Sequence, residues 1–368
     1  MRTLYKNSID LLLTYQQPEG GFLACPNFSN YQYVWFRDGS FCAYALDLCG
    51  ETQHADRFHQ WVMMVLRRYQ KKMQNCIQQS TNGILLPADE CLHSRFTAEG
   101  LEIPGHWGHH QLDGLGTWVW AYEQHLQTTQ QSVPQENISL LELVRDYLAA
   151  LWRFPCSDCW EENENQISTH TLGAVFAGMN AIANLLDDAK AKACAEDIQK
   201  FLLEQAVVDG HLTKTLHAGE AVDANLLFLA TPYEVISVDD VRFQATLSLV
   251  KKDLTSKEGG VKRYLSDTYY GGGEWLLLSA CLGWVACSAG DIPFANHLLT
   301  WIESQATVDL ELPEQVAKNL NNPAYLQVWT DRWGSVATPL LWSHAQYLIL
   351  YHAIQNSKEQ NHDQTGIL

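Results

Sequence analysis

The chain has 368 residues, 46% of them hydrophobic and 18% charged, so it can bury a large core and is not intrinsically disordered. Lys and Arg number 24 against 42 Asp and Glu, which gives a net charge of −18. This charge disfavours nucleic acid and anionic membrane surfaces as partners. No run of about 18 uncharged apolar residues occurs, so no membrane-spanning helix is expected.

The N-terminal segment and the cysteines together indicate a cytoplasmic protein. Asp10 and several other polar residues stand where a signal peptide needs its apolar region. The ten cysteines are scattered, and several lie in apolar helical patterns, which is typical of buried free thiols in a reducing compartment. Cys156 and Cys159 form a single C-x-x-C, which without a second pair is a weak zinc or redox signal.

Apolar residues spaced three or four apart predict helices along the whole chain. The predicted ranges are 5–15, 39–49, 55–70, 115–127, 138–152, 170–186, 190–206, 238–251, 274–288, 291–305 and 335–355. The best strand candidates are the short stretches 31–35 and 211–216, and 357–368 is expected to be a polar tail. About eleven helices without a linker or a fixed repeat favour one all-α domain over 1–368. A closed barrel of six helical hairpins fits this number.

Segments that mix aromatic and charged residues lie between the predicted helices, often directly before one begins. Such loops are where a rigid scaffold presents its functional side chains. Indole rings can pack on sugar rings while charged groups bond the hydroxyls, and a pair of carboxylates can cleave an acetal. The segments are YQYVWFRD at 31–38, HWGHHQLDG at 106–114, CWEEN at 159–163, RYLSDTYYGGGEW at 263–275, and LPEQV at 312–316 followed by PLLWSHA at 339–345.

Taken singly, most of these residues have a purely structural explanation. No phosphate-binding loop, zinc-protease motif or nucleophile elbow is present, and the three histidines at 106–110 lack a matching carboxylate at metal-ligand spacing. These histidines are therefore expected to form hydrogen bonds near a polar pocket and not to bind a metal. The structural alternatives are a helix cap for Asp38, a first helical turn for Glu161 and Glu162, a surface pair for Arg263 and Asp267, a core anchor for Trp275 and a loop carboxylate for Glu314.

In this order, however, the segments resemble glycoside hydrolase family 15, which contains glucoamylases and glucodextranases. The resemblance covers the chain from about residue 30 to 350 and rests on motifs that are specific only in combination. It implies an (α/α)6 barrel and an inverting, exo-acting α-glucosidase that releases β-glucose and needs no cofactor. The motifs are Y-x-W-x-R-D at 33–38, W-E-E at 160–162, R-Y-x-x-D-x-Y-Y-x-G-x-x-W at 263–275, and P-E-Q-V at 313–316 followed by P-L-x-W-S-H-A at 339–345.

The resemblance implies roles for particular residues by position. Glu161 would be the general acid, and Glu314 the general base that activates water and must therefore be ionised. Inversion requires the two carboxyl groups to lie about 6.5–9.5 Å apart. Glu162 would reach the second sugar. Arg37, Asp38, Arg263 and Asp267 would hold the terminal glucose, and the remaining substrate-binding candidates are Tyr33, Trp35, Trp107, Gln111, Asp113, Trp160, Tyr269 and Trp275.

Two departures from the family pattern concern the second sugar. Segment 317–338 carries Tyr325, Trp329 and Trp333 and is expected to wall the pocket, and Gly273-Glu274 replaces an Asn-Pro common before the tryptophan. We expect short α-gluco-oligosaccharides as substrates, with a preference for α-1,6 bonds as in isomaltose. The alternatives are an α-1,4-preferring glucoamylase, a trehalase or sugar epimerase on the same barrel, and a non-catalytic sugar-sensing barrel. The sequence leaves the oligomeric state open.

Overall fold

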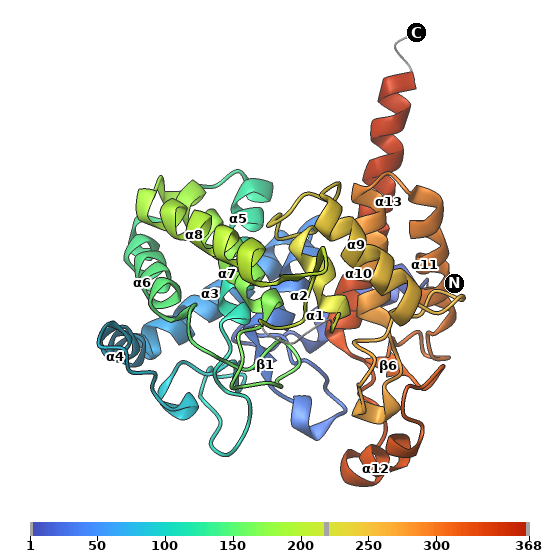
Figure 1. Cartoon of the computed structure of the whole chain (residues 1–368), viewed down its shortest axis with the longest axis horizontal. Helices are drawn as coiled ribbons and strands as arrows, with labels where there is room; N and C mark the ends of the chain where they lie inside the picture. Colours follow the sequence, from blue (N-terminus) through green and yellow to red (C-terminus); the bar gives the residue numbers. More distant parts are fainter. Residues whose placement is uncertain (1–2, 217–220, 366–368) are drawn as a thin grey trace.

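The helices form two concentric layers in the computed structural model, which describes residues 3–216 and 221–365 (Figure 1). Each element of the inner layer contacts the next, and α13 returns to contact α2, so the ring closes. The inner elements are α2 (Phe36–Leu48), α5 (Asp113–Thr129), α7 (Thr169–Leu186), the 3-10 helix η3 (Ala224–Leu229), α10 (Leu276–Ser288) and α13 (Leu341–Thr365).

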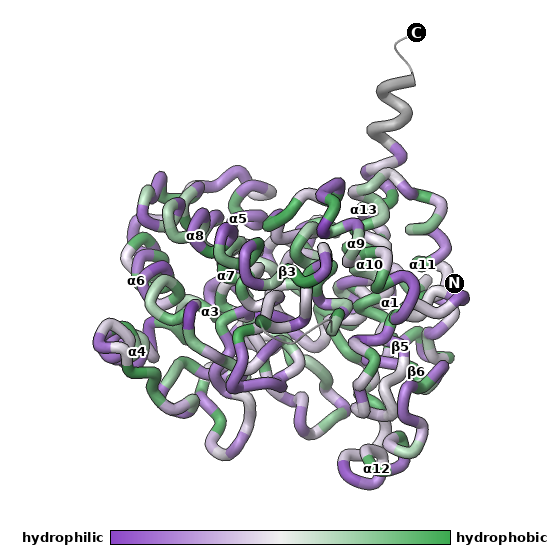
Figure 2. The backbone as a smooth tube through the Cα atoms, in the orientation of Figure 1, coloured by the Kyte–Doolittle hydropathy of each residue, from purple (hydrophilic) through white to green (hydrophobic). Residues whose placement is uncertain are grey.

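The outer layer supplies one helix for each inner element, so the fold is the expected all-α (α/α)6 barrel. Outer helices pack on inner ones: α3 on α2, α8 on α7, α11 on α10 and α1 on α13. Along outer helices such as α8, hydrophilic and hydrophobic residues alternate (Figure 2). The outer helices are α1 (Leu4–Tyr15), α3 (Thr52–Arg68), α6 (Gln135–Leu151), α8 (Ala189–Gln205), α9 (Val241–Leu249, continued by the π-helix η4, Val250–Leu254) and α11 (Ile292–Ser304).

The axis of the ring is filled by aromatic side chains. Phe41 of α2 stacks on Trp342 of α13, with ring centroids 5.5 Å apart, and its ring lies 5.4 Å from that of Phe228 in η3. All three side chains are buried. Since α2 and η3 are not neighbours in the ring, this contact crosses the interior, and the barrel is closed along its axis by packed side chains.

Three short antiparallel strand pairs tie the loops together at the ends of the helices. They are β1 (Val34–Trp35) with β2 (Arg95–Phe96), β3 (Val207–Val208) with β4 (His211–Leu212), and β5 (Glu274–Trp275) with β6 (Gln315–Val316). Both predicted strand stretches therefore contain a strand, of two residues each. Single 3-10 turns complete the loops: η1 (Ser29–Tyr31), η2 (Ala88–Glu90) and η5 (Tyr269–Gly271).

The sequence patterns missed two helices, α4 (Gln70–Thr81) and α12 (Ala324–Trp333). Both helices lie at the margin of the core: α4 buries only three side chains and α12 none, so each has only a short apolar face. The last helix begins at Leu341, later than predicted, and continues to Thr365, so the expected polar tail is helical through that residue. In the part of the chain that is described, none of the helices combines the length and the apolar character that crossing a membrane requires.

Candidate active site

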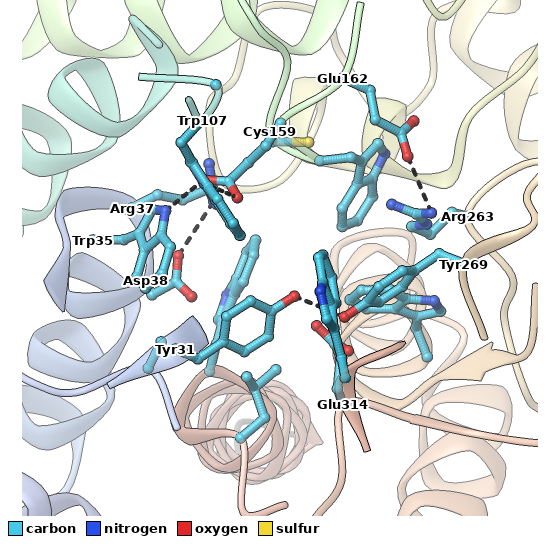
Figure 3. A pocket seen from close by; sticks show the side chains of 18 of the residues that line it. Tyr31, Trp35, Arg37, Asp38, Trp107, Cys159, Glu162, Arg263, Tyr269 and Glu314 are labelled. Carbon is cyan, nitrogen blue, oxygen red and sulfur yellow. Dashed lines mark hydrogen bonds and ion pairs between the residues drawn. The ribbon is translucent and has the colours of Figure 1, made fainter. Parts of the chain in front are cut away.

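The pocket lies where the inner elements begin. Arg37 and Asp38 are in the first turn of α2, Trp275 precedes α10, and Trp342 is the second residue of α13. Together they open onto a pocket of about 330 Å³, at the small end of the range for ligand pockets (Figure 3). Eleven of the fifteen residues predicted from the sequence line it: Trp35, Arg37, Asp38, Trp107, Trp160, Glu161, Glu162, Arg263, Tyr269, Trp275 and Glu314.

The other predicted residues lie behind the lining. Gln111 accepts a hydrogen bond from Arg37 Nη1 at 2.9 Å and donates one to Glu161 Oε1 at 3.0 Å. Asp113 is fully buried and accepts from the same Arg37 nitrogen at 3.0 Å. These two residues therefore position the lining and do not form part of it.

Asp267 and Tyr33 are also one layer removed from the pocket. Both oxygens of Asp267 accept hydrogen bonds from the guanidinium of Arg263, at 2.8 and 2.5 Å, which fixes the plane of that group. Tyr33 packs under Arg95, whose guanidinium lies 5.0 Å from the Tyr33 ring centre and 3.7 Å from that of Trp107. The sequence did not predict Arg95 as a site residue because it lies outside every quoted motif.

Glu161 is held firmly by nitrogen donors at both carboxylate oxygens. Trp35 Nε1 donates to Oε1 and Trp107 Nε1 donates to Oε2, each at 2.6 Å. The backbone of Glu161 has a φ of +67°, an uncommon value for a residue other than glycine. This turn directs its side chain toward the two indoles and not into a helical first turn, which excludes that structural alternative.

Glu314 occupies a different environment, immediately before β6. Its side chain is buried, and burial raises the pKa of its carboxyl to about 8, although the charge of Arg263 and hydrogen bonds from Tyr31 and Tyr269 act to lower it. The unliganded site therefore favours the neutral form near pH 7, whereas a general base was expected to be ionised. The sequence could not reveal this because the burial comes from the surrounding loops.

Arg37 and Asp38 form a charged pair at the base of the pocket. Arg37 Nε lies 3.4 Å from Asp38 Oδ2, and its guanidinium lies over the Trp342 ring at 5.2 Å. Burial raises the pKa of Asp38 to about 6, with Arg37 opposing the shift. Asp38 Oδ2 has no hydrogen-bond partner among the described residues. Asp38 therefore presents a carboxyl group to the pocket that is not tied up by hydrogen bonds at both oxygens.

A second charged group surrounds Glu162 at a more exposed position. Its Oε1 lies 3.3 Å from Arg263 Nη2, and its Oε2 accepts from the hydroxyl of Tyr264 at 2.5 Å and lies 3.6 Å from Lys214 Nζ. The Glu162 side chain is 35% exposed. The arrangement orients Glu162 across the pocket from Trp107, as Figure 3 shows.

The structure adds lining residues that the motif analysis had not selected. Tyr31 donates to or accepts from Tyr269, their hydroxyls 2.9 Å apart. Trp329 and Trp333 of α12 also line the pocket, and Trp333 stacks on Trp107 at 6.3 Å. The expected wall from segment 317–338 is thus present. The four-residue spacing of its tryptophans, which places both on one helix face, was the available signal.

The cysteines are in the state that the sequence predicted. All ten cysteines are free thiols. Cys159 lines the pocket, but its Sγ accepts a hydrogen bond from Asn225 at 3.2 Å, and burial raises its pKa well above the usual value. A thiol of this kind is a poor nucleophile. Cys156 is buried outside the pocket, so the C-x-x-C does not present two reactive thiols.

A closed barrel of paired helices with carboxyl groups in an aromatic pocket is typical of a glycoside hydrolase. The family model described as glycosyl hydrolases family 15 matches residues 1–300 of the chain. The chain belongs to this family.

Particular relatives are similar over nearly the whole chain. The isomaltose glucohydrolase of Kribbella flavida is 37% identical, across 95% of this chain and 92% of that protein. A solved wild-type glycosidase superimposes with a TM-score of 0.91 at 37% identity, covering 96% of each chain, and a variant glycosidase solved in complex with glucose gives 0.90. A bacterial glucoamylase complexed with acarbose is 20% identical with a TM-score of 0.75, which supports the fold alone.

Proposed function

We propose that this protein is an inverting, exo-acting α-glucosidase that removes glucose from the non-reducing end of short α-gluco-oligosaccharides, with a preference for the α-1,6 bond of isomaltose. The observation that carries the proposal is the pocket itself. Glu161 and Glu314 share it with Arg37, Asp38 and Arg263. Charged groups among indole rings suit a sugar, whose hydroxyls and C–H faces need both.

In the proposed mechanism, Glu161 protonates the glycosidic oxygen while Glu314 removes a proton from the attacking water. The indole donors fix the position of Glu161, and the hydroxyls of Tyr31 and Tyr269 stabilise ionised Glu314. Asp38 and Arg37 bind hydroxyls of the terminal glucose. Water attacks the face opposite the leaving group, so β-glucose forms first.

The preference for isomaltose rests on the relative and on the small volume of the pocket. The glucohydrolase of Kribbella flavida is 37% identical. Trp329 and Trp333 close one side of the pocket, which favours short substrates. We further propose a cytoplasmic location, because all ten cysteines are free thiols and most are buried, as expected in a reducing compartment.

Proton NMR on an equal mixture of isomaltose, maltose and trehalose tests the proposal. We expect isomaltose to disappear first and the β-anomer signal of glucose to rise before the α-anomer signal. Trehalose is included because Trehalase 2 of Sulfolobus acidocaldarius is 27% identical over 71% of this chain and 49% of that protein. Faster loss of maltose or trehalose would contradict the proposed preference for isomaltose. Earlier appearance of α-glucose would exclude inversion, and consumption of none of the three sugars would contradict the proposed activity.

A further inference from the structure

A second cluster of polar side chains is buried between α2, α3 and α5, remote from the pocket. Asp47 is the penultimate residue of α2, His59 is in the middle of α3, and His125 is near the end of α5. Because α2 and α5 begin at the pocket and rise about 1.5 Å per residue, Asp47 and His125 lie roughly 14–18 Å further along their helices than Asp38 and Asp113. The cluster is thus at the opposite end of these helices.

The three side chains converge closely enough that they could hold one metal ion. One ligand atom from each lies within 4.8 Å of the others, and all three residues are buried. His125 Nδ1 is 3.0 Å from Asp47 Oδ1, and the rings of His59 and His125 are centred 4.9 Å apart. Two imidazole nitrogens and one carboxylate oxygen form a donor set typical of zinc and neighbouring divalent metals.

His59 is the residue that points most clearly to a ligand. It is completely buried, and in the described parts of the chain neither of its ring nitrogens has a hydrogen-bond partner. Its ring is bordered by Tyr122, centred 5.2 Å away, and by His125.

We propose that Asp47, His59 and His125 bind a divalent transition-metal ion, with Zn²⁺ as the best match to the donors. Asp56, one turn before His59 on α3, has Oδ1 3.8 Å from His125 Nε2 and a side chain 47% exposed. Asp56 therefore lies at the ring nitrogen of His125 that faces away from Asp47, on the side nearer to solvent, and is not one of the three converging ligands. The ion joins three helices of the barrel and has a structural role, so this inference does not depend on the proposed glucosidase activity.

Metal analysis of the full-length chain tests the site. The protein is stripped with a chelator, incubated with Zn²⁺ and freed of excess metal. We expect about one zinc ion per chain and a higher melting temperature than in the stripped form. His59→Gln and Asp47→Asn should each weaken binding, measured by competition with a chromophoric chelator, by about 100-fold or more, since even outer-shell changes cost about 10–100-fold.

His110→Gln is the matched control. His110 is also buried with both ring nitrogens unpartnered in the described residues, but it belongs to no group of three metal-ligating side chains there. Its substitution should leave the zinc content unchanged. Visible absorption of the unaltered chain loaded with Co²⁺ provides a measurement that needs no variant. Absence of bound metal and of a Co²⁺ spectrum, or equal binding by His59→Gln, Asp47→Asn and the control, would overturn the proposal.

Discussion

The two carboxyl groups with proposed catalytic roles have chemically different neighbours. Glu161 accepts from two indole N–H groups, whereas Glu314 faces two phenol hydroxyls and the guanidinium of Arg263. Indoles can only donate, so they fix an acceptor, while phenols can donate or accept and can follow a change of charge. The difference permits the roles of the two residues to be separated by experiment.

Glutamine substitutions should separate the acid from the base. Both Glu161→Gln and Glu314→Gln should lower kcat on isomaltose by about 10²–10⁴-fold, the usual contribution of such groups. α-Glucosyl fluoride has a leaving group that needs no proton, so Glu161→Gln should retain most of the wild-type rate on it and Glu314→Gln should not. Initial rates by fluoride electrode give the comparison. The reverse pattern would exchange the two roles.

The raised pKa of Glu314 predicts an unusual pH profile. As the general base, Glu314 must be ionised, and its pKa in the free site is about 8. The fraction of the free enzyme with ionised Glu314 increases about tenfold per pH unit below pH 8, so the plot of kcat/KM against pH should show an inflection near pH 8.

Variants of neighbouring tyrosines test whether the inflection of kcat/KM near pH 8 comes from Glu314. Tyr269→Phe removes a hydrogen bond that lowers the pKa of Glu314, so the inflection of kcat/KM should move to higher pH in this variant. Tyr264→Phe is the control, since the Tyr264 hydroxyl bonds Glu162. A pH profile without an inflection near pH 8, or one that shifts equally in Tyr269→Phe and Tyr264→Phe, would contradict the assignment.

At the scale of elements, α12 owes its position to asparagines in the segment before it. Asn319 Nδ2 donates to the buried Glu274 at 2.7 Å, Asn321 accepts from Lys262 Nζ at 2.8 Å, and Asn322 Nδ2 donates to the carbonyl of Asp267 at 3.0 Å. Gly272 has a φ of +69°, and a Cβ there would meet the Asp267 oxygen at 2.4 Å, so this crossing requires glycine. The segment is thereby fixed over the site.

Removing one wall tryptophan should change the length preference. Trp333→Ala removes the ring that stacks on Trp107 and should raise kcat/KM for isomaltotriose relative to isomaltose by about 2–10-fold, in line with the energy of one aromatic contact. Competition assays of the two sugars measure the ratio. Tyr325→Ala is the control, because Tyr325 lies on the same helix with 45% of its surface exposed. An equal change in both variants would contradict a specific role for the wall.

The elements that the sequence predicted and those that it missed differ in how they are stabilised. Helices such as α7, buried almost throughout residues 169–182, have long apolar patterns. In contrast, α12 buries none of its side chains, and the fourth inner element is only the six-residue 3-10 helix η3. Such elements depend on tertiary contacts for their stability, and these leave little trace in local periodicity.

On the scale of the whole molecule, the ring depends on close contacts between inner helices. A Cβ on Gly116 of α5 would meet the carbonyl oxygen of Ala174 at 2.2 Å, and one on Gly178 of α7 would lie 2.8 Å from the Gly116 Cα. The two helices therefore cross with their backbones nearly touching.

Gly116→Ala should lower the free energy of unfolding by about 1–3 kcal/mol, as overpacking typically does. Helix propensity alone predicts the opposite sign, a gain of about 1 kcal/mol. Urea unfolding at constant protein concentration decides between them. Gly290→Asn is the control, since a Cβ at Gly290 meets nothing within 4 Å and asparagine tolerates its positive φ. If Gly116→Ala is as stable as wild type, α5 and α7 can move apart at their crossing to accommodate the added methyl group.

The motifs located most of the pocket lining because its residues lie at the start of inner elements or in the loops that lead into them. The motifs could not distinguish residues that line the pocket from residues that hold the lining in position. Asp113 is the first residue of α5 yet lies behind Arg37, and Asp267 lies behind Arg263. That distinction depends on how neighbouring loops fold over one another, and so do the burial of Glu314 and its pKa.

The filled axis of the barrel also determines how a longer substrate is processed. Phe41, Phe228 and Trp342 block any passage through the ring. The glucose released in the pocket must leave by the route through which the sugar entered, and the shortened chain must first withdraw. Each encounter therefore yields one cleavage, attack is distributive and not processive, and every intermediate length should accumulate during digestion of an oligosaccharide.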